Sequence, residues 1–361
     1  MSVKRRQFMI AAGAALSTPR LASGASPPTT WRMITSWPRN LPGPGVTAQR
    51  LADRITALSG GELTIKLYGA GEVVPALEVF DAVAEGVAEL GHTASFFWQG
   101  KMSASVFFTA VPFGLTADEH AAWIYHGGGQ ALWDALYADL GVSPFMAGNT
   151  GMGMGGWFKR ELAGVESLKG LKYRIPGLGG EILRRLGAVP VTLAPGDIFP
   201  ALQTGVVDGA EFVGPWSDMA FGFYKVAPYY YWPGFHEPNG SAECLVNNEK
   251  FAALDPMLRE VIINACQAEN AYSVAEANWQ NAQALDTLIA KYDVKIRRFS
   301  DEILTATRDI AAEVLDEFAN RDAMSRQIYE SYSAARTQAM AWSHVSSSAF
   351  LNARAGAAAC G

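Results

Sequence analysis

The chain has 361 residues, a length that fits about two domains of ordinary size. Hydrophobic residues make up 49% of it and charged residues 18%, a balance that supports packed cores and excludes disorder for the bulk of the chain. The formal net charge of −6 provides no basic surplus to neutralise a phosphate backbone, so the composition disfavours nucleic-acid binding. It still permits one local cationic anchor for a small anion.

The first 25 residues have the features of an export signal. Three basic residues at positions 4–6 precede an uncharged apolar run at 8–16, and small residues at 23–25 offer a cleavage site. The apolar run is too short to span a bilayer. The pair Arg5-Arg6 also resembles a twin-arginine signal, which exports folded proteins. We therefore predict a signal peptide over residues 1–25 and a mature periplasmic protein.

The next segments alternate between strand and helix. Residues 31–36 and 63–68 are rich in strand-forming residues, whereas 46–58 and the segment after Pro75 have apolar residues at helical spacing. This order predicts an α/β fold with parallel strands.

A short internal similarity suggests two related lobes. Residues 80–89 and 199–208 share Phe, Ala, Gly and Val at a constant offset of 119, and each reads as a helix closed by glycine that leads into a strand. Chance similarity is the alternative for so short a match. Ligands of open α/β sheets bind beyond the carboxyl ends of the strands. Two facing lobes would then place residues 92–98 opposite 211–212 across a cleft.

The C-terminal third is predicted to be helical, with helices over 256–290, 300–318 and 324–350 that either brace both lobes or form a partner surface. The predicted organisation is lobe I at 26–149 with a return segment near 241–255, lobe II at 150–236, and a helical segment at 256–361.

Familiar catalytic and metal motifs are weak or missing. A GxGxxG occurs at 151–156, but no helix opens inside it, so a wall beside a ligand is a better interpretation than a dinucleotide site. The five histidines show no HExxH spacing, and no GxSxG occurs, which disfavours an enzyme. The three cysteines, Cys244, Cys266 and Cys360, fit no zinc pattern and are expected to be small buried side chains.

Two charged residues end apolar strands. Arg174 follows a predicted strand and could clamp a carboxylate with two parallel hydrogen bonds, or simply be a solvated surface arginine. Glu211 ends the strand at 209–213 and is either paired, at a rim, or a ligand of a hard cation. Glu237 and Glu243 follow and could complete an acidic set. The aromatic runs at 96–98, which include Phe96 and Trp98, and at 229–232 are a mixture of core packing and possible cleft lining.

The sequence as a whole resembles the solute receptors of tripartite ATP-independent periplasmic (TRAP) transporters, of the DctP-like family. The resemblance covers nearly all of the mature chain and rests on the segments at 61–65, 69–72, 81–83, 186–191, 196–203 and 205–211. Segments at 148–151, 154–158 and 226–231 resemble the branch that binds 2-oxo or 2-hydroxy monocarboxylates with a metal ion.

The resemblance implies two α/β lobes joined by a hinge, with an interlobe cleft and long helices that span both lobes. It implies that Arg174 binds the substrate carboxylate and that Glu211 and the Phe212 carbonyl hold a bridging Na⁺ or Ca²⁺. The further residues expected to bind the substrate are Asn149, Phe96, Trp98, Gly153 and Phe212. Either Glu237 or Glu243 would supply the second acid. Relatives in this branch can form homodimers through the C-terminal helix. Two positions depart from the branch, which often has glutamine in place of Gly153 and tryptophan in place of Phe212.

We therefore expect a periplasmic receptor that has no catalytic residues and that delivers a small organic acid anion to a TRAP membrane permease. The alternatives are an exported enzyme acting on a small organic acid and a receptor for a peptide or a sugar.

Overall fold

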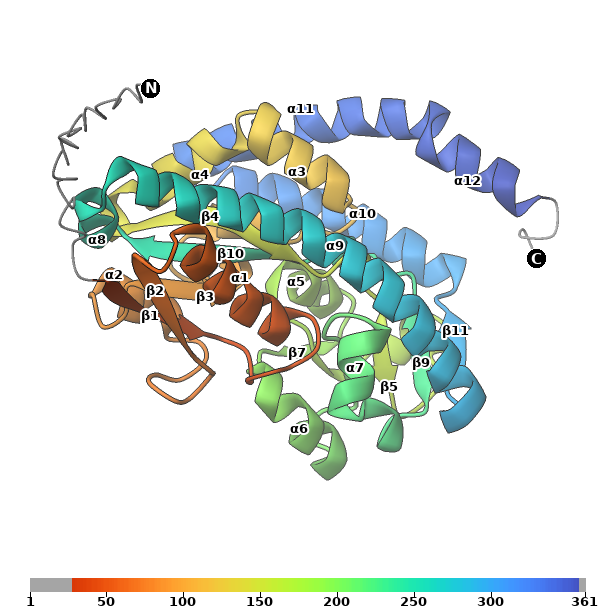
Figure 1. Cartoon of the computed structure of the whole chain (residues 1–361). Coiled ribbons are helices and arrows are strands. Elements are labelled where there is room, and N and C mark those ends of the chain that lie inside the picture. Colours follow the sequence, from red (N-terminus) through yellow and green to blue (C-terminus); the bar gives the residue numbers. More distant parts are fainter. Residues whose placement is uncertain (1–27, 357–361) are drawn as a thin grey trace, which may run out of the picture.

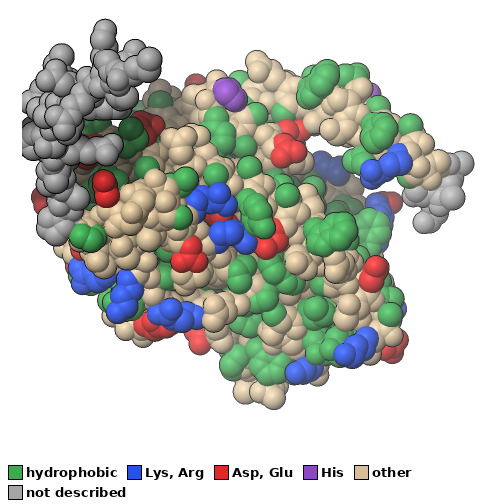
Figure 2. Space-filling model, in the orientation of Figure 1, with side chains coloured by type: hydrophobic (Ala, Val, Ile, Leu, Met, Phe, Trp, Pro, Cys, Tyr) green, Lys and Arg blue, Asp and Glu red, His purple; other side chains and the backbone are tan. Residues whose placement is uncertain are grey.

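Two mixed β-sheets organise the chain into two lobes. The computed structural model describes residues 28–356 (Figure 1). The predicted export signal at 1–25 and Cys360 lie outside the described residues. We define lobe I by the five-stranded sheet and lobe II by the six-stranded sheet. This is the two-lobed α/β architecture that the sequence predicts. On the face shown in Figure 2, basic and acidic side chains are interspersed.

Lobe I contains the N-terminal strands and one strand that returns from lobe II. Its sheet has the order β2 (Leu63–Tyr68), β1 (Thr29–Thr35), β3 (Leu90–Thr93), β10 (Ser241–Asn247) and β4 (Val142–Asn149). Its helices are α1 (Pro44–Leu58), α2 (Val79–Ala84), α3 (Ala117–His126) and α4 (Gly129–Tyr137). Strand β1 is parallel to β2 and β3, but β10 runs antiparallel between β3 and β4. The two strands predicted to be parallel, at 31–36 and 63–68, are therefore parallel as β1 and β2, whereas β10 makes this sheet a mixed one.

Helix α1 shows why these residues fold as they do. Pro44 occupies the first turn, where its missing N–H costs nothing, and Ala48, Leu51, Ala52 and Ile55 form one buried face.

Lobe II has the strand order β11 (Lys295–Arg298), β9 (Tyr229–Trp232), β5 (Gly156–Phe158), β8 (Gly209–Ala210), β6 (Lys172–Arg174) and β7 (Val189–Val191). Its helices are α5 (Gly177–Arg185), α6 (Ile198–Thr204) and α7 (Pro215–Phe221). Strand β11 lies in the gap between the helices predicted at 256–290 and 300–318, within a C-terminal segment for which no strand was predicted. Four residues suffice for this edge strand, which pairs in parallel with β9.

The C-terminal helices are α8 (Asn248–Ala253), α9 (Pro256–Tyr292), α10 (Asp301–Ala319), α11 (Ala323–Val345) and α12 (Ser347–Ala355). Asp255 caps α9 by accepting a hydrogen bond from the Met257 backbone N–H at 2.8 Å. Helix α9 contacts β4 and α1 of lobe I and α7 of lobe II, so it spans both lobes (Figure 1). Among the described residues, no helix combines the length and apolar character needed to cross a membrane.

Candidate functional site

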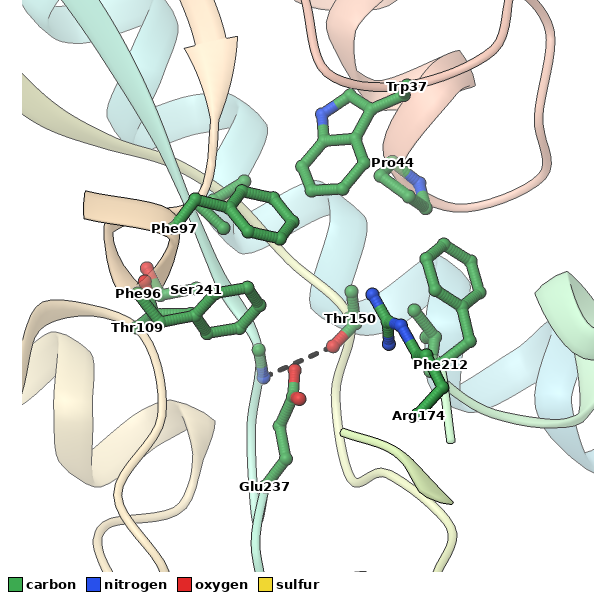
Figure 3. Close-up of a pocket in the computed structure, with 14 residues that line it drawn as sticks. Trp37, Pro44, Phe96, Phe97, Thr109, Thr150, Arg174, Phe212, Glu237 and Ser241 are labelled. Carbon is green, nitrogen blue, oxygen red and sulfur yellow. Dashed lines mark hydrogen bonds between the residues drawn. The ribbon is translucent and has the colours of Figure 1, made fainter. Parts of the chain in front are cut away.

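A cavity lies where the two lobes meet. It encloses about 400 Å³ of empty space that is partly open to solvent. Lobe I contributes the segment that follows β3, with Phe96 and Phe97, and lobe II contributes Arg174 and the segment that follows β8, with Phe212 (Figure 3). The two strand ends that were predicted to face each other across a cleft therefore both line it. The remaining lining residues are Trp37, Pro44, Ala94, Thr109, Thr150, Val213, Glu237 and 240–242.

Arg174 is the cationic group of the cavity. It ends β6, and only 2% of it is exposed. Its Nη1 donates to the Glu211 carbonyl oxygen at 2.8 Å and to Glu211 Oε1 at 2.6 Å, while Nε and Nη2 donate to the Leu193 carbonyl at 3.3 and 3.2 Å. A guanidinium has five N–H groups, so one N–H of Nη2 is left without a partner among residues 28–356. The expected clamp of two parallel hydrogen bonds is therefore reduced to one available donor in this arrangement.

Glu211, His236 and Glu237 form a buried cluster beside Arg174. One ligand atom from each side chain lies within 4.8 Å of the others. His236 Nε2 and Glu211 Oε2 are 3.2 Å apart, so the imidazole donates to the carboxylate oxygen that Arg174 leaves free. Arg174 hydrogen-bonds Glu211 but not Glu237, and the cavity beside them is lined mainly by aromatic and aliphatic residues together with Thr109, Thr150 and Ser241.

The ionised form of Glu237 is unfavourable in this cluster. Burial raises the pKa of Glu237 well above its usual range, the Glu211 charge raises it further, and Arg174 offsets part of the effect. A buried carboxylate beside another carboxylate resists ionisation unless positive charge is added. A cation at this point would therefore relieve the repulsion.

The donor chemistry of the cluster fits a hard cation. Na⁺ and Ca²⁺ prefer oxygen ligands, which Glu211 Oε2 and the Glu237 carboxylate supply, whereas the His236 nitrogen is a ligand they disfavour. Gly153 lies against this site, because a Cβ atom there would come within 2.9 Å of the Glu237 carbonyl and 3.1 Å of the Val213 carbonyl. The loop around the acids therefore packs directly on the Gly153 backbone. The Phe212 ring lies 5.9 Å from the Arg174 guanidinium carbon.

Glu243 and Trp98 lie elsewhere. Glu243 is buried in the core of lobe I, where its oxygens accept hydrogen bonds from Trp98 Nε1 at 2.5 Å and Tyr137 OH at 3.1 Å. Burial raises the pKa of Glu243 to about 8. The structure thus brings Glu237 to Glu211 and leaves Glu243 outside the cluster, and it turns Trp98 into the core rather than toward the cavity.

Asn149 supports the chain where it leaves lobe I. Its side-chain Nδ2 donates to Asn239 Oδ1 at 2.9 Å, and its side-chain Oδ1 accepts from the Gly151 N–H at 2.9 Å. It lines a smaller neighbouring cavity rather than the one that contains Arg174.

The comparisons with known proteins agree with this geometry. Residues 36–322 match the family of bacterial extracellular solute-binding proteins, family 7 (DctP). The chain belongs to this family. A solute receptor is therefore confirmed, in place of the exported enzyme kept as an alternative.

Close relatives of this DctP-family protein are known. The monocarboxylate 2-oxoacid-binding periplasmic protein of Nostoc sp. (strain PCC 7120) is 39% identical over 97% of this chain and 98% of its own length. A solved structure of a TRAP solute-binding protein of Bordetella bronchiseptica is described as a dimer with calcium and picolinate. Its sequence is 36% identical to this chain, and the two structures superpose with a TM-score of 0.90 over 92% of this chain and 99% of the relative. One from Pseudoalteromonas atlantica, with sodium and pyruvate, is 37% identical with a TM-score of 0.87, covering 90% and 99%.

Several site residues of this DctP-family protein were not anticipated. His236 belongs to the acidic cluster although it has no metal-binding spacing, and its position next to Glu237 is the only sequence feature that indicates such a role. His92 and His120 are buried and hydrogen-bonded within lobe I, His92 to Trp37 and His120 to Asn239, and burial lowers the pKa of each to about 4. Trp37 and Pro44 also reach the cavity, from a loop whose proline and glycine residues mark a turn but not a binding site.

Proposed function

We propose that this protein is a periplasmic receptor for a small 2-oxo monocarboxylate, of which pyruvate is the simplest, bound together with Na⁺ or Ca²⁺. The observation that carries the proposal is that Arg174 and Glu237 line the interlobe cavity, with the buried Glu211 carboxylate directly behind them. The relatives described as binding 2-oxoacids, or containing pyruvate with sodium, support the ligand class and the cation.

Each group has a distinct part in binding. The free N–H of Arg174 would donate a charge-assisted hydrogen bond to the ligand carboxylate. Glu211 and Glu237 would hold the cation, with the Phe212 carbonyl as a further candidate ligand, and the cation supplies positive charge for the ligand oxygens. Phe96, Phe97 and Phe212 exclude water from the cavity, which strengthens these charge interactions. Closure of the two lobes over the ligand completes the enclosure.

Isothermal titration calorimetry tests the proposal directly. After treatment with a chelator, the protein is titrated with pyruvate in sodium-free buffer, then with added NaCl or CaCl₂. We expect binding that strengthens with one of the cations and is weak with propanoate, which lacks the 2-oxo group. Absence of pyruvate binding under all three conditions would contradict the proposal.

Family membership also supports the biological setting. We infer that residues 1–25 are removed on export, that the receptor works in the periplasm, and that it delivers its ligand to a TRAP membrane permease. A homodimer is part of this proposal, because Trp342 and Phe350 are 70% and 64% exposed on helices that project from the body of the molecule (Figure 1). The Bordetella bronchiseptica relative described as a dimer supports it.

A further inference from the structure

The loop at residues 37–44, between β1 and α1, touches both the cavity and lobe II. Its first and last residues, Trp37 and Pro44, line the cavity (Figure 3). Leu41 in its middle is only 6% exposed, and it is part of the hydrophobic cluster of lobe II that includes Trp157 and Leu202. A lobe I side chain therefore completes a lobe II core.

The same loop makes a polar contact with α7. Ser217 Oγ donates to the Pro42 carbonyl at 2.8 Å. Gly43 has φ +82°, and a Cβ atom there would lie 2.7 Å from Ser217 Oγ and 4.0 Å from Ser217 Cβ. The approach is close enough that any side chain at position 43 would meet Ser217. Figure 1 shows the loop reaching down from β1 and α1 to the side of α7.

On the lobe I side the loop is firmly braced. Arg39 forms an ion pair with Glu72 and donates to the Leu67 carbonyl at 2.8 Å, and the Ala70 N–H donates to the Trp37 carbonyl at 3.0 Å. The loop therefore belongs mechanically to lobe I, and Leu41 is the part of it that must leave lobe II when the lobes separate. Exposure of a buried leucine to water is unfavourable, so this contact opposes opening.

We propose that Leu41 and Ser217 form an interlobe latch that stabilises the closed receptor and thereby sets ligand affinity without touching the ligand. The inference rests on the proposed function only in taking closure to accompany binding. Contacts made only in the closed state increase the population of that state. A ligand that requires the closed state then binds with higher apparent affinity.

The first test compares Leu41→Ala with wild type, using pyruvate with CaCl₂ as the probe. We expect Kd to rise roughly tenfold or more, mainly through faster dissociation, because burial of a leucine side chain corresponds to at least one such factor. The melting temperature of the ligand-free protein should hardly change. Leu202→Ala is the matched control, since Leu202 is buried in the same cluster but comes from lobe II itself, and it should lower that melting temperature. An unchanged Kd for Leu41→Ala would overturn the latch.

A second test needs no ligand. The 4.0 Å separation of Cβ positions at 43 and 217 lies in the range for a disulfide. In a Gly43→Cys, Ser217→Cys, Cys360→Ser background, which removes the Ser217 hydroxyl from both proteins and so isolates Leu41, we expect oxidative cross-linking to be several-fold slower when Leu41→Ala is added. Equal rates would overturn the latch. If wild type fails to bind pyruvate, the proposed function fails, and the cross-linking rates still decide the latch.

Discussion

Arg174 and Glu211 hold each other at the ends of two neighbouring strands. Arg174 pairs with Ala210 in the parallel register of β6 and β8, so Glu211 is the next residue along. The Glu211 N–H donates to the Arg174 carbonyl at 3.1 Å, while Arg174 Nη1 donates back to both the carbonyl and the carboxylate of Glu211. The sheet register itself therefore fixes this buried ion pair, and loss of either partner leaves an uncompensated charge.

Arg174→Ala should weaken pyruvate binding by about 2–5 kcal/mol, because the ligand carboxylate and Glu211 both lose a desolvated partner. The melting temperature should also fall, since one buried charge is left alone. Titration calorimetry and thermal denaturation measure the two effects. Arg184→Ala is the control, because Arg184 forms only an exposed ion pair within its own helix. Wild-type affinity in Arg174→Ala would contradict the assigned role.

Glu237→Gln should abolish most of the thermal stabilisation by calcium. Glutamine preserves shape but removes the charge that the neighbouring Glu211 already disfavours, so the metal-free protein should be at least as stable as wild type. Melting curves with EDTA and with CaCl₂ test this. Glu243→Gln also neutralises a buried acid but lies outside the cluster, and it should retain the full calcium response. Equal calcium shifts in Glu237→Gln and wild type would remove Glu237 from the cation site.

The contribution of two buried acids to the stability of the ligand-free protein should fall as pH rises from 5 to 8. Burial raises the pKa of Glu243 from 4.5 to about 8, and that of Asp218 from 3.8 to about 7. The folded protein therefore holds protons that the unfolded chain releases in this window, so their stabilising contribution is complete below about pH 4 and is lost as pH rises through the folded values.

Urea unfolding of Glu243→Gln isolates one of these groups. Glutamine imitates the protonated acid, with its oxygen accepting from Trp98 and its amide donating to Tyr137. Between pH 5 and 8 the variant should lose on the order of 2–4 kcal/mol less unfolding free energy than wild type. His92 and His120 titrate alike in both proteins and cancel in the comparison. Parallel pH profiles would show that Glu243 is ionised in the folded protein throughout.

Gly153→Ala should reduce calcium-dependent pyruvate binding. The added methyl group would lie 2.9 Å from the Glu237 carbonyl and 3.1 Å from the Val213 carbonyl, so the backbone that carries the acid must shift. Such overpacking typically lowers the free energy of unfolding by about 1–3 kcal/mol. Gly196→Ala is the control, because nothing lies within 4 Å of a Cβ atom there. Calorimetry that gave the same Kd for both variants would contradict the argument.

Trp342→Asp combined with Phe350→Asp should convert a dimer into a monomer in size-exclusion chromatography with light scattering. The change places charge on the apolar surface of the projecting C-terminal helices. Trp279→Asp, a 69% exposed tryptophan on α9, should leave the mass unchanged. A monomeric wild type would contradict the proposed dimer.

Much of the fold could be predicted because the signals were local. The bounds of α9 and α10 differ from the predicted ones by two residues or fewer, since a capped start and a sustained apolar pattern mark them. Strand β11 was missed because four residues between two long helices carry too little pattern. The antiparallel position of β10 depends on a long-range pairing with β3 and β4 that no local signal contains.

Some residues of the candidate site could also be predicted from the sequence, and others could not. Arg174 and Glu211 could be found because a charge at the end of an apolar strand is unusual. The choice between Glu237 and Glu243 could not be made from the sequence. Every residue of β10 is buried, so the strand has no alternating polar pattern to show whether Glu243 points toward the cavity or into the core. Consecutive aromatics in the 3₁₀ turn at Ser95–Trp98 point in different directions, so Phe96 and Phe97 reach the cavity while Trp98 does not.

Helix α9 runs unbroken for 37 residues, about 55 Å, along both halves of the receptor. Because this one helix packs against both lobes, it limits how far the lobes can reorient relative to each other. Less orientational entropy of the lobes is then lost when a ligand binds between them. The chain also passes between the two lobes at 150–155, between β4 and β5, and at 233–240, between β9 and β10. A binding site assembled from both halves can therefore re-form in the same geometry at every cycle of capture and release.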